Sequence, residues 1–190
     1  MTQVHRVGGR RIELTIRPGT PRLLSGAAIA RAVAAALDAG GAPAPASVSV
    51  VLSDDAELAE LNETHLGHEG PTDVLSFPLL PPEAFPRHEG QAASARSSRR
   101  SAGGAGAAFI LPPGARAQLG DIVVSVERAV AQASEGRGGQ TGDHRWAPVD
   151  ELRLLVTHGT LHLCGWDHAE PAEEAAMRAL ERRLLGDVPG

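Results

Sequence analysis

The sequence predicts an α+β fold in a single domain, residues 1–190, with a small four-stranded mixed sheet and helices packed around it. The length of 190 residues suits one domain with one hydrophobic core. Segments that alternate as strands do are interleaved with segments of helical composition, but without the strict alternation of a purely parallel fold. No internal repeat is visible, which argues against a solenoid or a propeller.

In the first half of the chain we expect two strand–helix pairs and a third strand. Residues 12–16 alternate as a strand does, and the alanine-rich residues 25–39 form a helix that ends before two glycines. The β-branched residues 47–53 form the next strand, and an aspartate directly after it caps a second helix. Residues 72–80 form a strand that Pro78 confines to an edge or ends, because proline donates no hydrogen bond to a neighbouring strand.

The second half of the chain contains an insertion, the fourth strand and three helices. Residues 81–117 are rich in Pro, Gly, Ala, Ser and Arg and bury too little apolar surface to offset the entropy of ordering, so we expect a flexible insertion. The fourth strand follows at residues 120–126 and leads into a helix. The next helix begins at Pro148 and runs to about Leu163, and residues 171–185 form an amphipathic packing helix with its charges on the exposed face.

The composition excludes several classes of protein. Cys164 is the only cysteine, which excludes a disulfide framework, and the absence of lysine excludes Schiff-base chemistry and a P-loop. The net charge of -5 argues against a protein that coats nucleic acid through a generally basic surface. No apolar run approaches the roughly 18 residues that cross a membrane, and no secretory signal is visible, so we expect a cytoplasmic protein without membrane contact.

The residues capable of chemistry are concentrated in the string HGTLHLCGWDH at residues 158–168. His158 and His162 are four residues apart, so on a helix their rings lie on one face and can reach the same point. Gly165 can take the left-handed conformation that ends a helix, so that His168 returns to the pair. Three imidazoles suit zinc and leave its fourth position open, which is typical of a catalytic site. These residues predict a zinc-dependent hydrolase.

The same histidine spacing occurs in the metzincin proteases, HExxHxxGxxH, which are the main alternative class. In those proteases a glutamate follows the first histidine as general base, whereas this chain has Gly159, which accepts no proton. Asp167 is the nearest carboxylate within the string. We predict that it is a catalytic residue that assists water or holds a histidine ring; the alternative is an aspartate that only forms a turn in solvent.

Other reactive residues are expected to have ordinary roles. Cys164 lies about 200° around the helix from His162 and is predicted to be a buried, inert thiol. His65 and His68 have a spacing that suits a metal but lack a third partner, so we expect a surface turn or a role on the substrate side. Three arginines of the insertion are predicted to be solvated, although they could contact phosphates: Arg96, Arg99 and Arg100.

The string HGTLHLCGWDH resembles the signature of the YbeY family of bacterial metal-dependent endoribonucleases, also called rRNA maturation factors, which reads approximately HGxLHLxGYDH. Trp166 replaces the usual tyrosine by another aromatic residue. Two further blocks match in order and spacing, PTDVLSFP at residues 71–78 and LGDIVVS at residues 119–125. The resemblance covers nearly all of residues 47–185 and implies an α+β fold whose metal-bearing helix lies beside a small mixed sheet.

The resemblance also implies an activity, partners and site residues. The implied activity is metal-dependent, single-strand-specific cleavage of RNA in the maturation of ribosomal RNA, at the 3′ end of the small-subunit RNA, and in ribosome quality control. The implied partners are ribosomal RNA, the small ribosomal subunit and a small-subunit ribosomal protein. The implied ligands of one Zn2+ per chain and the implied substrate-side residues are His158, His162, His168, Asp73, Ser76 and Phe77.

Two departures from the family pattern are visible. Family members commonly carry an arginine shortly before the PTDVLSFP block, where this chain has Leu66. The insertion at residues 81–117 is longer than usual, and its arginines could compensate for the missing one. Two other functions therefore stay open: a non-catalytic ribosome assembly factor with a structural zinc, and a metalloprotease-like hydrolase that lacks the usual glutamate.

Overall fold

The computed structural model describes residues 1–88, 90–91, 115–135 and 147–186. These ranges contain strands, α-helices and one short 3-10 helix, η1. In chain order the elements are β1 (Thr2–Val7), β2 (Arg10–Ile16), α1 (Gly26–Ala39), β3 (Ala46–Ser53), α2 (Asp55–Leu66), β4 (Val74–Pro78), η1 (Pro82–Ala84), β5 (Ala117–Ser125), α3 (Val126–Glu135), α4 (Pro148–Leu163) and α5 (Pro171–Leu185).

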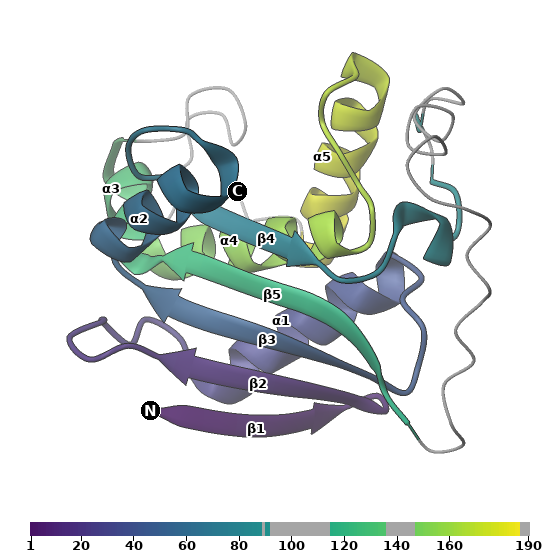
Figure 1. Cartoon of the computed structure of the whole chain (residues 1–190), viewed down its shortest axis with the longest axis horizontal. Coiled ribbons are helices and arrows are strands. Elements are labelled where there is room, and N and C mark those ends of the chain that lie inside the picture. Colours follow the sequence, from purple (N-terminus) through teal and green to yellow (C-terminus); the bar gives the residue numbers. More distant parts are fainter. Residues whose placement is uncertain (89, 92–114, 136–146, 187–190) are drawn as a thin grey trace.

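The strands form one mixed sheet in the order β1-β2-β3-β5-β4 (Figure 1). β2, β3 and β5 are parallel to one another, and an antiparallel strand is added at each edge. The predicted α+β class and the mixed sheet are confirmed. The strand that contains Pro78 is β4, and it lies at an edge of the sheet as predicted. An edge strand has a neighbour on one side only, so it tolerates a proline, which has no amide hydrogen to donate.

The predicted number of four strands is wrong, because β1 is a fifth strand in the described part of the chain. Polar side chains, Gln3 and His5, occupy its positions on the side of α1, so β1 lacks the apolar alternation that marks a half-buried strand. The available signal was the pair Gly8 and Gly9, whose φ angles of 55° and 77° form a two-residue hairpin turn between β1 and β2. Two glycines between two short segments favour such a hairpin even where one segment is largely polar.

The helices begin close to the predicted residues because their caps are local. The Ser25 hydroxyl accepts a hydrogen bond from the Ala28 amide at 3.2 Å, and the Asp54 carboxylate accepts one from the Glu57 amide at 2.9 Å. Pro148 opens α4 as predicted. None of the described helices combines the length and the apolar character needed to cross a bilayer.

The main core lies between one face of the sheet and the helices behind it in Figure 1, α1 and α4. Inward side chains such as Leu14, Val50 and Ile122 are fully buried there. α2 covers part of the opposite face with a smaller cluster around Leu58. The C-terminal half of α4, which carries the histidines, is thereby held against β4 and β5.

The predicted insertion at residues 81–117 is described only at its two ends. Residues 82–84 form η1, Phe85 is buried in the main core, and β5 begins at Ala117. The prediction of flexibility falls on residue 89 and residues 92–114, which lie outside the described residues.

Candidate metal centre

The end of α4 positions the three histidines. Two backbone hydrogen bonds close the helix. The Gly165 amide donates to the His162 carbonyl at 3.0 Å, and the Trp166 amide donates to the Leu161 carbonyl at 3.2 Å. Gly165 takes the predicted left-handed conformation, with φ 83°, which glycine adopts at little cost. The chain therefore reverses directly after α4 and brings His168 back to His158 and His162.

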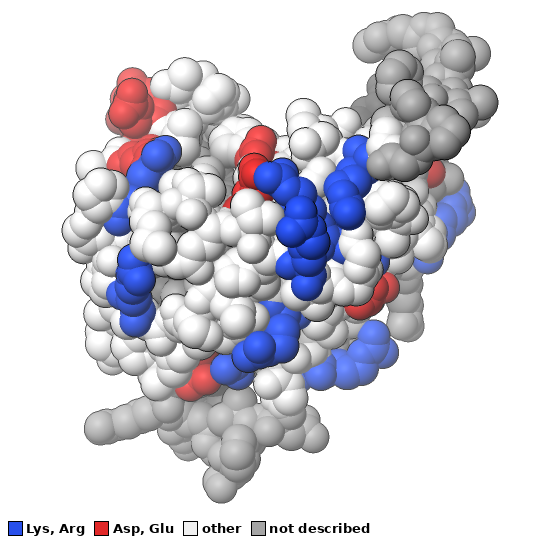
Figure 2. All heavy atoms as spheres, turned by 90° about the horizontal axis from the view of Figure 1, so that it is seen from below, with Lys and Arg blue, Asp and Glu red and all other residues white. Residues whose placement is uncertain are grey.

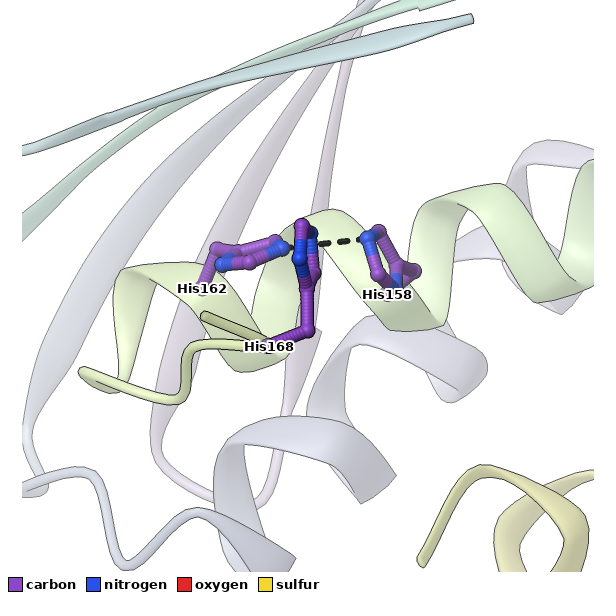
Figure 3. A group of neighbouring side chains, drawn as sticks. All are labelled: His158, His162 and His168. Atoms are coloured by element: carbon purple, nitrogen blue, oxygen red, sulfur yellow. Dashed lines mark hydrogen bonds between the residues drawn. The ribbon is translucent and has the colours of Figure 1, made fainter. Parts of the chain in front are cut away.

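The three imidazole rings converge on one point (Figure 3). The ring centroids of His158 and His162 are 4.6 Å apart, and the His168 ring lies 5.7 and 5.1 Å from them. One nitrogen from each ring lies within 4.8 Å of the other two. The two helical histidines are half-buried, whereas His168 is exposed. The structure thus brings together the three residues predicted as ligands, and this histidine trio could bind a metal ion.

Hydrogen bonds determine which nitrogen of each helical histidine faces the centre. Nδ1 of His158 donates to Glu181 Oε1 at 2.7 Å, and Nδ1 of His162 donates to the Trp166 carbonyl oxygen at 2.8 Å. Both partners are acceptors, so each Nδ1 carries a proton and Nε2 is the nitrogen that faces the centre of the trio. The two Nε2 atoms lie 3.0 Å apart, the contact dashed in Figure 3. The two Nε2 atoms are therefore close enough together to bind one metal ion.

A metal ion fits this arrangement better than a proton does. The pKa of His162 is lowered to about 4, first by burial and then by the nearby His158 and His168. The His162 ring is therefore neutral near pH 7, as a metal-binding imidazole must be. Two nitrogens of a tetrahedral zinc site with Zn–N bonds of about 2.0–2.1 Å stand roughly 3.3 Å apart, close to the separation of the two Nε2 atoms. His168 contributes the third nitrogen of the trio from the exposed turn that follows α4.

Glu181 on α5 is a site residue that the sequence reasoning missed. Its side chain is only 8% exposed, and it holds the His158 nitrogen that faces away from the centre. Such a carboxylate sets the tautomer and orientation of a metal-binding imidazole and raises its basicity. The prediction that α5 keeps its charges on the exposed face is wrong for Glu173 and Glu181, which are buried along the same stripe as Met177 and Leu180. The signal in the sequence was a glutamate at a position of α5 that faces the core, because a buried carboxylate needs a partner.

A cleft of about 610 Å³ opens onto the trio from the side of β4. Asp73 and Ser76 line it, at the positions predicted for the substrate side. The Ser76 hydroxyl donates to the Gly159 carbonyl at 2.9 Å, and Asp73 accepts a hydrogen bond from Gln132 at 3.1 Å, so both residues also hold β4 in place. Leu66, at the position where the resemblance led us to expect an arginine, lines the same cleft with an apolar side chain.

Phe77, the third residue expected on the substrate side, is not among the described residues that line this cleft. Successive side chains of a strand point to opposite faces, so the neighbour of Ser76 on β4 faces away from it. Phe77 packs in the smaller cluster beneath α2, and its ring meets His65 edge to face at 5.3 Å. The block PTDVLSFP thus contains the strand that borders the cleft, β4, but Phe77 lies on the face of β4 that is covered by α2.

Asp167 lies in the cleft wall beside the trio and is exposed. Its Oδ1 accepts a hydrogen bond from the His168 amide at 2.8 Å, so the carboxylate shapes the turn that carries the third histidine. The ring-orienting contact considered for Asp167 is made to His158 by Glu181. A catalytic role for Asp167 stays a prediction.

Two further buried residues, His88 and Glu173, hold the ligand-bearing turn. Glu173 Oε1 accepts a hydrogen bond from the Asp167 amide at 3.1 Å and lies 2.6 Å from His88 Nε2. The His88 ring stacks on Trp166 with the centroids 3.9 Å apart. Sequence reasoning missed the contact between His88 and Glu173 because these residues are 85 positions apart in the chain.

Gly159 occupies the position of the protease glutamate, and its surroundings explain why it has no side chain. A Cβ there would lie 2.8 Å from methyl carbons of Ile122 and Val74 and 3.1 Å from Ser76 Oγ. α4 approaches the sheet closely at this residue, so a carboxylate at this position would displace β4 and β5. The packing of the fold therefore excludes the metzincin arrangement.

We expect Gly159→Ala to lower the free energy of unfolding by about 1–2 kcal/mol. Overpacking costs about 1–3 kcal/mol, and the higher helix propensity of alanine offsets at most about 1 kcal/mol of it. Urea denaturation of the metal-free protein measures the change. Val74→Ala removes one of the two crowded methyl groups, so the double variant should lose less than the two single variants combined. Strict additivity would contradict the clash.

The remaining candidates have structural positions or lie outside the described residues. Cys164 is buried, and desolvation raises the pKa of its thiol to about 12, which confirms the inert thiol. His65 and His68 are exposed and do not belong to the histidine trio. The three arginines of the insertion fall within residues 92–114 and are not described: Arg96, Arg99 and Arg100.

Comparison with known proteins gives one consistent similarity. The family model described as Endoribonuclease YbeY matches residues 24–188. The proteins named Endoribonuclease YbeY from Roseiflexus castenholzii and Salinispora tropica are 34% and 42% identical to this chain. The first alignment covers 92% of this chain and 91% of the relative, and the second covers 79% of each. The solution structure of TM1509 from Thermotoga maritima is 21% identical, with a TM-score of 0.49, and the match covers 94% of this chain and 90% of that one.

Proposed function

The chain belongs to the YbeY family of endoribonucleases, and on that premise we propose that it is a zinc-dependent endoribonuclease specific for single-stranded RNA. We propose that it acts in the maturation of ribosomal RNA, at the 3′ end of the small-subunit RNA, and in ribosome quality control. The observation that carries the metal-dependent part is the pair of Nε2 atoms of His158 and His162, which lie 3.0 Å apart in the histidine trio beside an open cleft.

The histidine trio would hold one zinc ion per chain. When bound, zinc supplies Lewis acidity toward a phosphoryl oxygen and toward water. All three histidines line the cleft, so a phosphodiester that enters the cleft lies against them. Asp167 stands in the same wall, where its exposed carboxylate can take up a proton during hydrolysis. The chain thus supplies the ligands, the cleft and a candidate base.

Asp73 and Ser76 are proposed to contact the substrate from β4. The Ser76 hydroxyl donates to Gly159, so its oxygen is left to accept a hydrogen bond from a ribose hydroxyl. An ionised Asp73 also only accepts, which suits hydroxyl or amino groups rather than phosphates. Single-stranded RNA presents both kinds of group. Phe77 has no part in this proposal because it faces α2.

The partners that accompany this function are ribosomal RNA, the small ribosomal subunit and a small-subunit ribosomal protein, in the cytoplasm. The described lining of the cleft contains two carboxylates, Asp73 and Asp167, and no arginine. Such a cleft attracts the RNA backbone weakly, because neutralised phosphates supply most of the sequence-independent affinity. We therefore propose that placement on a ribosomal particle supplies the affinity that the cleft lacks.

A non-catalytic assembly factor with a structural zinc is the second candidate function. Structural zinc sites are closed by four protein ligands, whereas the described residues supply a trio that lines an open cleft. A metalloprotease is the third candidate, and Gly159 counts against it because it offers no general base. The open trio without an adjacent glutamate favours the nuclease.

The experiment that separates these functions incubates zinc-loaded protein with labelled single-stranded RNA, with the same RNA as a duplex, and with casein. We expect cleavage of the single-stranded RNA alone, loss of cleavage when a chelator removes the zinc, and its return when zinc is restored. Binding of RNA without cleavage would indicate the assembly factor, and cleavage of casein would indicate the protease. Metal analysis of the purified protein identifies the ion, because imidazoles also accept nickel, manganese or iron.

A further inference from the structure

A second hollow, of about 220 Å³, adjoins the histidine trio between α4 and α5. His158 and His168 line both this hollow and the larger cleft beside β4. The trio therefore lies where the two hollows meet. A strand of nucleic acid that reaches the trio through the cleft can continue into the space against α5.

The two hollows differ in charge. The described lining of the larger cleft contains no arginine, whereas the smaller hollow contains Arg178. Figure 2 views the molecule from below in Figure 1, from the β1 side of the sheet, and shows arginines spread over that face; β4 and the cleft belong to the opposite edge.

The position of Arg178 relative to the trio follows from helix geometry. Glu174, Arg178 and Glu181 are spaced at i, i+4 and i+7 and so share one face of α5. Glu181 is anchored to His158 Nδ1 at 2.7 Å, which turns this face of the helix toward the trio. Arg178 is therefore one helical turn from the residue that touches a metal ligand.

Arg178 is free to exchange its partner. It forms an ion pair with Glu174 at 2.5 Å, and the two side chains are 44% and 40% exposed. Ion pairs this open to water contribute little, because solvent screens them and holding two long side chains costs entropy. A phosphodiester offers the guanidinium two parallel hydrogen bonds, whereas the contact with Glu174 is made to one carboxylate oxygen, Oε1.

We propose that Arg178 binds the phosphate next to the one held at the histidine trio, so that the RNA strand passes from the cleft beside β4 across the trio into the hollow against α5. This inference rests on the proposed function, because it presumes an RNA substrate. Glu174 competes with that phosphate for the guanidinium and thereby limits the affinity of the free protein for RNA.

The test measures RNA binding by four zinc-loaded full-length proteins: wild type, Arg178→Ala, Glu174→Gln and the control Arg183→Ala. Arg183 is an exposed arginine of the same helix that lines neither hollow. The probe is a single-stranded RNA with 2′-O-methyl riboses, titrated by fluorescence anisotropy over a series of salt concentrations. Cleavage of the unmodified RNA and zinc content are measured in parallel.

We expect Arg178→Ala to bind roughly 10-fold more weakly, the loss typical of one hydrogen-bonded charge contact. The slope of log affinity against log salt should fall in magnitude by about 0.7, the value for one phosphate contact on a single strand. Glu174→Gln should bind roughly 2- to 3-fold more tightly, because it removes the weak competing pair. Zinc content should be unchanged in every variant.

Three outcomes would overturn the inference. If the wild type cleaves RNA but Arg178→Ala and Arg183→Ala have equal affinity and equal salt slope, the phosphate subsite is rejected and the proposed function is retained. Loss of zinc from Arg178→Ala would assign this residue a structural role instead. A wild type that neither binds nor cleaves any RNA would reject the proposed function and this inference together.

Discussion

His162→Ala is expected to leave a folded protein that retains no zinc and cleaves RNA no faster than the zinc-free wild type. His162 is the predicted ligand at the centre of the trio: its Nε2 lies 3.0 Å from that of His158, and its Nδ1 donates a hydrogen bond to the Trp166 carbonyl oxygen. Without it two histidines remain, one of them on an exposed turn. We expect cleavage to fall by at least about 10²- to 10³-fold, the loss typical when one group that stabilises developing charge is removed. Metal analysis and single-turnover cleavage of single-stranded RNA measure the two effects.

His68→Ala is the matched control for this experiment, because His68 is an exposed histidine that does not belong to the trio. It should retain wild-type zinc content and wild-type cleavage after the same purification. Far-UV circular dichroism tests whether both variants are folded. Cleavage by His162→Ala at the wild-type rate would show that the nuclease activity does not depend on the trio, or comes from a contaminant.

Glu181→Gln is expected to weaken zinc binding by about 10-fold, and Glu181→Ala by up to about 100-fold, the range found when a group that supports a metal ligand is removed. Glutamine keeps an oxygen that can accept from His158 Nδ1 but loses the negative charge that makes the ring more basic. Alanine loses both, so the His158 ring can turn and Nε2 no longer points steadily at the trio. Competition with a chromogenic chelator measures the zinc dissociation constant.

Glu174→Gln is the control for the Glu181 variants, because it removes a carboxylate from the same face of α5 without touching a ligand. Its zinc affinity should equal that of the wild type. Urea denaturation of the zinc-free proteins separates lost packing from lost metal affinity, since Glu181 is buried. If Glu181→Gln binds zinc as tightly as Glu174→Gln does, the carboxylate has only a packing role.

Several features of the site could be predicted because they depend on neighbouring residues. The ring pair of His158 and His162 follows from their spacing on a helix, and the return of His168 follows from the left-handed Gly165. The caps at Ser25 and Asp54 are equally local. Each of these features is complete within about three helical turns of chain, so the pattern of residue types was enough to find it.

The sequence alone therefore determined the convergence of the three histidines, the helix ends and the α+β class. Only the tertiary structure decided that Glu181 orients His158 across 23 residues, that Ser76 meets Gly159 across 83, and that Phe77 faces α2 rather than the cleft. It also decided that β1 joins the sheet. Such contacts depend on which face of a strand or helix meets another element, and a one-residue change of register reverses that face without changing the local pattern.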